Sequence, residues 1–311
     1  MCMKRILFVV LIFAGHWNKS LAQINPEKSQ TGEIIELLFP QGKSKALILS
    51  YDDGRLEDRQ LVQLMNKYAL KGTFHLNSNK LGSEGYLNRS EIKALFTGHE
   101  VSVHSANHPP LTRLSKIDMV YEVVEDRKEL ERLMGYPVRG MAYPFGNHND
   151  TVVDVIKGLG IEYARTVNDT YAFQIPDNFL KWHPTVHQFA KAYWDPNNPE
   201  NDKKELARFY QLIHEYINTK DLALFDLWGH SWEMSNDKAK WNETEKTFQL
   251  LANHSNIHYT THIDLVDYLK AFQLLQFSVD KQMVFNPSAC TIYFKKSGKQ
   301  YSVMSGKTIH L

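Results

Sequence analysis

Short apolar segments alternate with segments of helical periodicity from Lys45 to about Phe272. The apolar segments are rich in β-branched and aromatic residues, which favour strands; they cover residues 46–51, 72–76, 100–104, 138–143, 161–166, 222–228 and 258–261. Strands that alternate with helices predict an α/β fold with a parallel sheet. About seven such units favour a distorted (β/α) barrel over an open doubly wound sheet, which stays the alternative. The first strand is not followed by the Gly-x-Gly-x-x-Gly pattern of nucleotide-binding open sheets.

The segments between these strands carry apolar residues three or four positions apart, which is the spacing of one helix face. The clearest sets are Leu61, Leu64, Met65 and Tyr68; Ile117, Val120, Tyr121 and Val124; and Leu206, Phe209, Tyr210, Ile213 and Ile217. Ser115 and Asp118 have the spacing of a capping box at the start of the second of these helices, and Gly135 is expected to end it. Gly158 and Gly160 are expected to end the next helix.

Two regions break this alternation. Residues 168–201 are rich in Asn, Asp, Pro and aromatic residues, which predicts a long loop of the kind that borders a binding cleft. After Phe277 the helical periodicity disappears, and short strand-like segments are separated by turn residues. We therefore expect a barrel domain over residues 23–276 and a small C-terminal β appendage over residues 277–311.

The first 22 residues have the pattern of a secretory signal peptide. Lys4 and Arg5 precede the apolar run from Ile6 to Gly15, and the small residues Ser20 and Ala22 precede a cleavage point before Gln23. The run is too short for the roughly 20 residues of a transmembrane helix, so no stable membrane insertion is expected. Export to the periplasm or the extracellular space follows, and an uncleaved N-terminal anchor is the alternative.

Charge and cysteine content narrow the classes of partner. Lysine and arginine total 36 and aspartate and glutamate 35, which gives a formal net charge of +1 and disfavours a nucleic acid partner. Cleavage before Gln23 leaves Cys290 as the only cysteine, so no intramolecular disulfide is expected. A chain of this size can be stabilised by its core instead. The oligomeric state is not indicated.

Two groups of candidate metal ligands follow predicted strands. Asp52 and Asp53 end the first strand, and Gly54 lets the chain turn so that both carboxylates can face one cavity. His104 and His108 follow the third strand, and with a carboxylate from another strand they can hold one ion and leave a position open. Alone, each group also fits a structural role, a turn or a capping feature. Their joint placement at strand ends favours a catalytic metal site.

A third group, Trp228 to Glu233, follows the strand over residues 222–228. His230 can serve as a general acid because its unperturbed pKa lies near neutrality. A structural histidine is the alternative. Trp228 and Trp232 are candidates for stacking on a sugar ring, and core packing is the alternative for both.

The motifs Tyr51-Asp52-Asp53-Gly54, His104-x-x-x-His108-Pro109, Tyr143-Pro144-Phe145-Gly146 and Trp228-Gly229-His230 follow one another along the chain. In this order they resemble the motifs of the polysaccharide deacetylase family, the nodulation-type deacetylase homology domain of carbohydrate esterase family four. The resemblance covers roughly residues 45–270. The first two motifs are highly specific as a pair, and the later two are looser.

The resemblance implies a divalent ion, most often Zn²⁺, held by Asp53, His104 and His108, with Asp52 as the general base. Metal and base together would activate water for attack on an acetyl carbonyl. Because Asp53 is used as a ligand, Asp52 is left to take the proton.

The resemblance further implies that the metal and the backbone N–H near Phe145 stabilise the oxyanion, and that His230 protonates the leaving amine. The candidate substrate contacts are Tyr143, Pro144, Phe145, Trp228 and Trp232.

The chain departs from the family pattern at two positions. Many family members carry an arginine where this chain has Ala142, and Arg139 is a possible substitute. The aspartate of the fourth motif is not obvious, and Asp169 is the candidate. Three further histidines are left out of the catalytic set as structural residues: His75, His183 and His187.

The function expected is metal-dependent hydrolysis of acetyl groups on a glycan, most often the N-acetyl group of a sugar. An O-acetyl esterase on an acetylated polysaccharide is one alternative, because it needs the same metal and base. A non-catalytic glycan-binding protein on the same barrel is the other. An enzyme is favoured by the retained residues, since binding alone requires no base beside a metal; they are Asp52, Asp53, His104 and His108.

Overall fold

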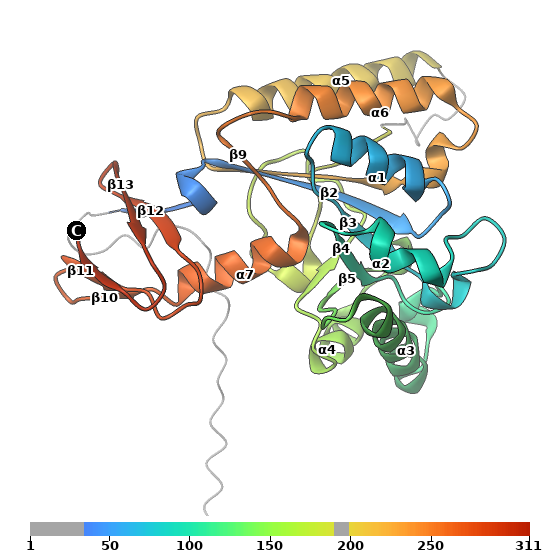
Figure 1. Cartoon of the computed structure of the whole chain (residues 1–311), viewed down its shortest axis with the longest axis horizontal. Coiled ribbons are helices and arrows are strands. Elements are labelled where there is room, and N and C mark those ends of the chain that lie inside the picture. The colour runs from blue at the N-terminus through green and yellow to red at the C-terminus, as the bar shows by residue number, and fades with distance from the viewer. Residues whose placement is uncertain (1–33, 190–198) are drawn as a thin grey trace, which may run out of the picture.

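The computed structural model describes residues 34–189 and 199–311 (Figure 1). The predicted signal peptide, residues 1–22, lies outside the described residues. The main sheet has the strand order β6-β5-β4-β3-β2-β8-β7, and all its pairings are parallel. Its strands are β2 (Lys45–Asp53), β3 (Thr73–Leu76), β4 (Glu100–Val103), β5 (Gly140–Ala142), β6 (Tyr163–Arg165), β7 (Val186–His187) and β8 (Ala223–His230).

One segment connects the two edges of this sheet. At one edge, the Trp182 amide donates to the carbonyl of Ala164 on β6 at 3.0 Å, and the Thr166 amide donates to the carbonyl of Trp182 at 2.8 Å. At the other edge, β7 pairs with Leu227 and Trp228 of β8. The sheet is thereby curled into a distorted barrel, which confirms the predicted fold class.

Two strands differ from the sequence prediction. β7 falls inside the stretch 168–201 that was predicted as a loop, because two residues are too few to give a periodic signal. The predicted strand 258–261 is β9 (Ile257–Tyr259), which pairs only with the first residues of β2 and is not one of the seven strands in line. The sheet therefore has seven strands in line, as predicted, but β7 takes the place of the predicted strand 258–261.

Helices cover the outside of the sheet, with α5 and α6 lying side by side in Figure 1 and α3 and α4 together on another side. Their bounds are α1 (Asp58–Lys67), α2 (Ile92–Leu95), α3 (Lys116–Met134), α4 (Asp150–Gly158), α5 (Pro199–Asn218), α6 (Lys238–Leu251) and α7 (His262–Gln273). The Ser115 hydroxyl accepts from the Asp118 amide at the start of α3, and Gly135 ends this helix at φ 81°. These predicted caps are confirmed.

The buried face of α3 is not the predicted one. Ile117 is 82% exposed and Tyr121 is 52% exposed, whereas Met119 and Val123 are buried. The face against the sheet also includes the buried carboxylate of Asp126, which accepts from the backbone amides of Ser78 and His104. A buried acid interrupts the apolar repeat, so the apolar residues alone gave the wrong side of the helix.

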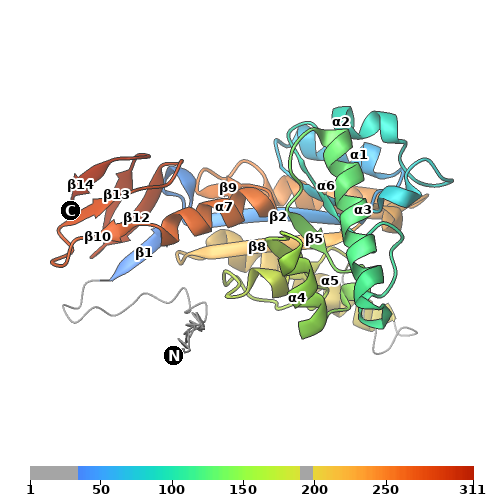
Figure 2. The same ribbon diagram turned by 90° about the horizontal axis from the view of Figure 1, so that it is seen from below.

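The C-terminal part forms two small antiparallel sheets, which confirms the predicted β appendage (Figure 2). One sheet has the order β10 (Gln276–Phe277), β11 (Met283–Phe285) and β14 (Thr308–His310). The other has the order β1 (Ile35–Leu38), β12 (Ile292–Lys296) and β13 (Lys299–Val303). β1 lies within the residues predicted for the barrel, yet it pairs along its whole length with β12.

None of the helices in the described part of the chain combines the length and the hydropathy that a bilayer span requires.

Candidate active site

The carboxyl end of β2 carries two aspartates that reach the same histidine. Asp53 has φ 85° and is followed by Gly54 at φ 72°, so the chain turns sharply where the strand ends. As a result, Oδ2 of Asp52 and Oδ1 of Asp53 lie 3.8 and 3.7 Å from Nε2 of His104. A left-handed aspartate is uncommon in a protein, and such backbone strain is concentrated at functional sites.

Asp53, His104 and His108 form a cluster that fits one metal ion. Their ligand atoms all lie within 4.8 Å of one another. Nε2 of His108 is 3.7 Å from Oδ1 of Asp53, as is Nε2 of His104. Ligand atoms around a tetrahedral zinc ion are about 3.4 Å apart for bonds of about 2.0 to 2.1 Å. The cluster is therefore close to the geometry of a three-ligand site with an open position.

Hydrogen bonds orient two of these candidate ligands. Nδ1 of His104 lies 2.8 Å from the carbonyl of Ala142, so a proton on Nδ1 leaves Nε2 free to bind. Oδ2 of Asp53 accepts a 2.8 Å hydrogen bond from the indole of Trp232, which leaves Oδ1 facing the histidines. Carboxylate and imidazole are both held in the orientation that metal binding needs.

His108 is held by a tight loop. Both Ser105 and His108 have left-handed backbones, at φ 64° and 63°, and the Ser105 hydroxyl accepts from the His108 amide at 3.0 Å. Burial and the neighbouring charge of His104 lower the pKa of His108 to about 4, against the opposing pull of Asp53 and Asp52. The imidazole is therefore neutral near pH 7, as a metal ligand must be.

Asp52 is paired with a buried arginine that the sequence analysis did not identify. One nitrogen of Arg165, on β6, donates to both carboxylate oxygens of Asp52. Both side chains are almost fully buried. Burial acts to raise the pKa of Asp52, but the charges of Arg165 and His104 outweigh it and hold the pKa far below its ordinary value. Asp52 is thus ionised across the neutral range.

His230 is fixed by a second carboxylate. Its Nδ1 lies 3.3 Å from Oε2 of Glu233, and Nε2 of His187 lies 3.1 Å from the same oxygen. Burial acts to lower the pKa of His230, but the hydrogen bond to Glu233 and the charge of Asp52 raise it overall. Glu233 belongs to the third candidate group of the sequence, and its spacing of three residues from His230 is that of a capping box, but its contacts with His230 and His187 were not predicted.

The structure places both residues that were considered for the departures from the family pattern, Arg139 and Asp169. Arg139 forms ion pairs with Glu162 and Asp267, and among the described residues it has none with Asp52 or Asp53. Asp169, the candidate for the fourth motif, accepts from the indole of Trp228 at 2.7 Å and from the His187 amide at 3.0 Å, so it supports the neighbours of His230.

The candidate substrate contacts separate by exposure. Phe145 is 59% exposed and Trp232 is 41% exposed, and the Phe145 ring lies edge-on to His108 with centroids 4.5 Å apart. Tyr143, Pro144 and Trp228 are buried. The Trp228 ring is covered by Arg165 at 4.7 Å, which argues against its stacking on a sugar.

Comparison with known proteins agrees with the sequence motifs. Residues 40–164 match the family model described as polysaccharide deacetylase. Over 115 residues the chain is 29% identical to peptidoglycan-N-acetylmuramic acid deacetylase PdaC of Bacillus subtilis (strain 168), covering 36% of this chain and 24% of that protein. Over 129 residues it is 26% identical to a chitin deacetylase of Colletotrichum lindemuthianum, covering 40% of this chain and 52% of that protein.

These matches span about a quarter to a half of the relatives' own lengths. Among solved structures, a protein of Mycobacterium smegmatis provisionally assigned as a polysaccharide deacetylase superposes with a TM-score of 0.57 at 13% identity. The superposition covers 77% of this chain and 94% of that chain, and at this identity it supports the fold alone. From its motifs, its fold and the matching family model, the chain belongs to the polysaccharide deacetylase family.

Proposed function

We propose that this protein is a metal-dependent hydrolase that removes the acetyl group from N-acetylated sugars of a glycan. The observation that carries the proposal is the grouping of Asp53, His104 and His108 beside an ionised carboxylate, Asp52, at one end of the barrel. His230 lies opposite Asp52 in the pairing of β2 with β8 and completes the set. Relatives named as deacetylases of peptidoglycan and of chitin support an acetylated glycan as the substrate.

In the proposed reaction, water adds to the acetyl carbonyl, the C–N bond breaks, and acetate and a free amine result. Asp52 takes a proton from the attacking water, since Arg165 keeps this carboxylate ionised and in place. His230 gives a proton to the leaving nitrogen, and Glu233 orients its ring. A divalent ion, with Zn²⁺ as the first candidate, would polarise the carbonyl and make water easier to deprotonate.

The two exposed aromatic side chains are the proposed contacts to the sugar. Phe145 and Trp232 flank the candidate metal ligands, and Trp232 also holds Asp53. The backbone N–H near Phe145 is the proposed second donor to the oxyanion. An O-acetyl ester is the second candidate substrate, because an alkoxide leaves with less help from His230 than an amine does.

The first experiment removes metal with a chelator and restores Zn²⁺, Mn²⁺, Co²⁺ or Mg²⁺ before acetate release is measured. Chitooligosaccharides, peptidoglycan and acetylated xylan serve as substrates. His104→Ala should lose both metal and activity, whereas Asp52→Asn should keep metal and lose turnover by at least about 10²-fold. His254→Ala is the matched control, because the imidazole of this histidine bonds to the Leu250 carbonyl of α6, and its other bonds are made by its backbone. Absence of metal uptake or of acetate release with every substrate would refute the proposal.

His230→Ala decides between amide and ester chemistry. We expect a loss of about 10²- to 10⁴-fold on an N-acetyl substrate and a clearly smaller loss on an activated acetyl ester. The amide nitrogen must be protonated as it leaves, whereas the ester oxygen need not be. Equal losses on both substrates together with loss of metal would assign His230 a structural or ligand role instead.

Export is proposed from the sequence pattern alone. The mature protein from its native host should begin at or near Gln23. N-terminal sequencing of the protein from culture fluid, periplasm and membrane tests this. A form that keeps Met1 in the membrane fraction would show that the N-terminal segment is an uncleaved anchor.

A further inference from the structure

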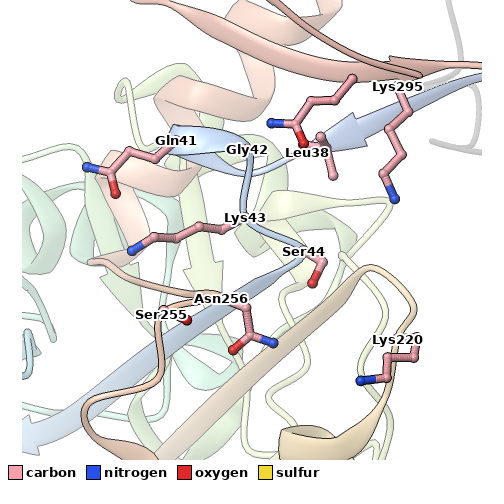
Figure 3. A pocket seen from close by; sticks show the side chains of 10 residues that line it. Leu38, Gln41, Gly42, Lys43, Ser44, Lys220, Ser255, Asn256 and Lys295 are labelled. Carbon is pink, nitrogen blue, oxygen red and sulfur yellow. The ribbon is translucent and has the colours of Figure 1, made fainter. Parts of the chain in front are cut away.

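A separate pocket of about 500 Å³ lies where the barrel meets the C-terminal appendage (Figure 3). Its barrel wall comes from residues that precede strands: Lys43 and Ser44 before β2, Lys220 before β8 and Asn256 before β9. Its appendage wall comes from β12 and β13, through Lys295 and Gln300.

This pocket is remote from the candidate active site. The catalytic groups follow the carboxyl ends of the strands, whereas the pocket lies at their amino ends. β2 runs from one to the other, and its nine residues span roughly 26 Å at about 3.3 Å per residue. A ligand in the pocket therefore makes no contact with the reacting group.

The lining is basic and rich in hydrogen-bond donors. Lys43, Lys220 and Lys295 contribute three ammonium groups, and Ser44 and Asn256 contribute a hydroxyl and an amide. No aspartate or glutamate is among the lining residues. In Figure 3 the ends of Lys220 and Lys295 point from opposite walls towards the space beside Ser44.

These lysines have no carboxylate partner within residues 34–189 and 199–311. Lys43 donates to the carbonyl of Ile257 at 3.0 Å, and neither Lys220 nor Lys295 forms an ion pair there. Glu36 faces Lys295 across the pairing of β1 with β12, yet the two are not joined by an ion pair. Within the described part of the chain, no carboxylate offsets the positive charge of this pocket by an ion pair, so a bound anion could do so.

Mutual repulsion of the basic groups also indicates that an anion would be stabilised in this pocket. Lys45 begins β2 beside the pocket, and its ammonium bonds to the carbonyl of Ile217 at 2.6 Å. Burial and then the charge of Lys220 lower the pKa of Lys45. A bound anion would offset part of this repulsion, because it brings an opposite charge next to Lys220, which lines the pocket.

We propose that this pocket binds the carboxylate or phosphate group of an anionic ligand, with an acidic glycan as the intended source. Charge-assisted hydrogen bonds from ammonium groups are the strong type for such oxyanions. An acidic polymer held there would be tethered to the protein at a point away from the acetyl group being hydrolysed. The appendage thereby supplies one wall of a binding site that the barrel alone does not complete.

The test is calorimetric titration of the whole protein at low salt with two probes, inorganic phosphate and oligogalacturonate. Lys220→Ala/Lys295→Ala should weaken binding by at least about tenfold, since two charge-assisted contacts are lost. Lys299→Ala is the matched control, because this lysine is on the same hairpin, outside the pocket, and its ammonium lies over the Tyr301 ring. Thermal unfolding of each variant checks that the fold is kept.

If the double variant loses binding of both probes, the pocket is a general oxyanion site. If it loses binding of oligogalacturonate alone, the pocket is a site for glycan carboxylates. Binding of neither probe by the unaltered protein overturns the proposal. So does binding that survives in the double variant or that falls equally in Lys299→Ala. Acetate release from neutral chitooligosaccharides is measured in parallel, and its presence or absence leaves the binding result unaffected.

Discussion

The pairing of Asp52 with Arg165 places two opposite charges inside the protein. The two residues are 113 positions apart and come from β2 and β6, which lie on different parts of the barrel. A buried ion pair is weak evidence for stability by itself, but removing one partner leaves the other charge uncompensated. Loss of Arg165 alone should therefore affect both the stability of the fold and the ionisation of Asp52.

Arg165→Met should lower the free energy of unfolding by about 3 to 5 kcal/mol at pH 7. Without Arg165, burial raises the pKa of Asp52, so the variant should be less destabilised as the pH falls and the carboxyl group becomes neutral. In the unaltered protein the depressed pKa of Asp52 contributes stability above its unfolded pKa, and this contribution is lost towards acid pH. Urea denaturation of the metal-free protein at several pH values measures the difference.

The double variant Arg165→Met/Asp52→Asn is the control for this prediction. Because it removes both charges, it should recover part of the loss seen in Arg165→Met. Equal losses in the single and double variants would mean that the ion pair is not the cause.

Glu233→Gln should shift the pH dependence of turnover. Glu233 accepts from the His230 ring and amide, and its charge contributes to the raised pKa of His230. Removing that charge lowers the pKa, so a smaller fraction of His230 carries the proton at pH 8. We expect turnover on an N-acetyl substrate to fall more at pH 8 than at pH 6. The kcat profile and the NMR titration of the His230 ring provide the measurements.

Glu243→Gln is the matched control for Glu233→Gln, because Glu243 accepts from Tyr210 on the helices outside the site. It should leave the pH profile unchanged. A Glu233→Gln profile that coincides with that of the unaltered protein would remove Glu233 from the proton transfer.

The sequence predicted the grouped acids and histidines but not the residues that hold them. Asp52, Asp53, His104 and His108 belong to short local motifs, and strand ends bring such motifs together in a parallel barrel. Arg165 reaches Asp52 from a strand 113 positions away, which no local spacing encodes. Glu233 has the capping-box spacing from His230, but this spacing alone does not reveal its contact with the imidazole. The same limit applies to Asp169, whose bond to the indole of Trp228 joins residues 59 positions apart.

At the scale of single elements, β5 depends on the absence of a side chain. A Cβ added to Gly140 would lie 2.1 Å from the ring of Tyr163 on β6. Tyr163 cannot move freely, because its hydroxyl donates to Glu100 and its ring stacks on His262. Close approach of these two strands is therefore possible only with glycine at this position.

Gly140→Ala should therefore destabilise the protein by about 1 to 3 kcal/mol, the cost of overpacking a core. Gly158→Ala is the control, because a Cβ there meets nothing within 4 Å at the end of α4. Helix propensity should make this second change neutral or stabilising by up to about 1 kcal/mol. Urea denaturation of both variants compares them, and similar losses would show that Tyr163 relaxes away from residue 140.

Helices α3 and α4 illustrate which properties of an element the sequence encodes well. Both ends of α3 and the C-terminal end of α4 were predicted correctly because the signals are local: Ser115 and Gly135 bound α3, and α4 ends at Gly158. The orientation of α3 was predicted wrongly, because Asp126 lies on its buried side and Ile117 on its exposed side. A periodicity argument assumes that buried means apolar, and a buried acid bonded to two backbone amides violates that assumption.

At the scale of the whole molecule, the appendage and the barrel share one core. Ile292 of β12 belongs to the same buried cluster as Ala46 and Ile48 of β2 and Leu269 of α7. The hydroxyl of Tyr268 on α7 joins the appendage strands, since it donates to the Leu38 carbonyl and accepts from the Tyr293 amide. The appendage is thus packed on the barrel through apolar contacts as well as through β1.

A shared core predicts that the two parts unfold together. Ile292→Ala should lower the free energy of unfolding by about 2 to 5 kcal/mol, the range for truncating a buried aliphatic side chain. Differential scanning calorimetry should show one transition that moves to lower temperature as a whole. Met304→Ala, which truncates an exposed side chain of the appendage, should leave the transition temperature unchanged.

If Ile292→Ala instead splits the curve, so that a small early transition separates from an unchanged main transition, the appendage is an independent unit. The basic pocket would then lie between two separately folding parts and not on a single rigid surface.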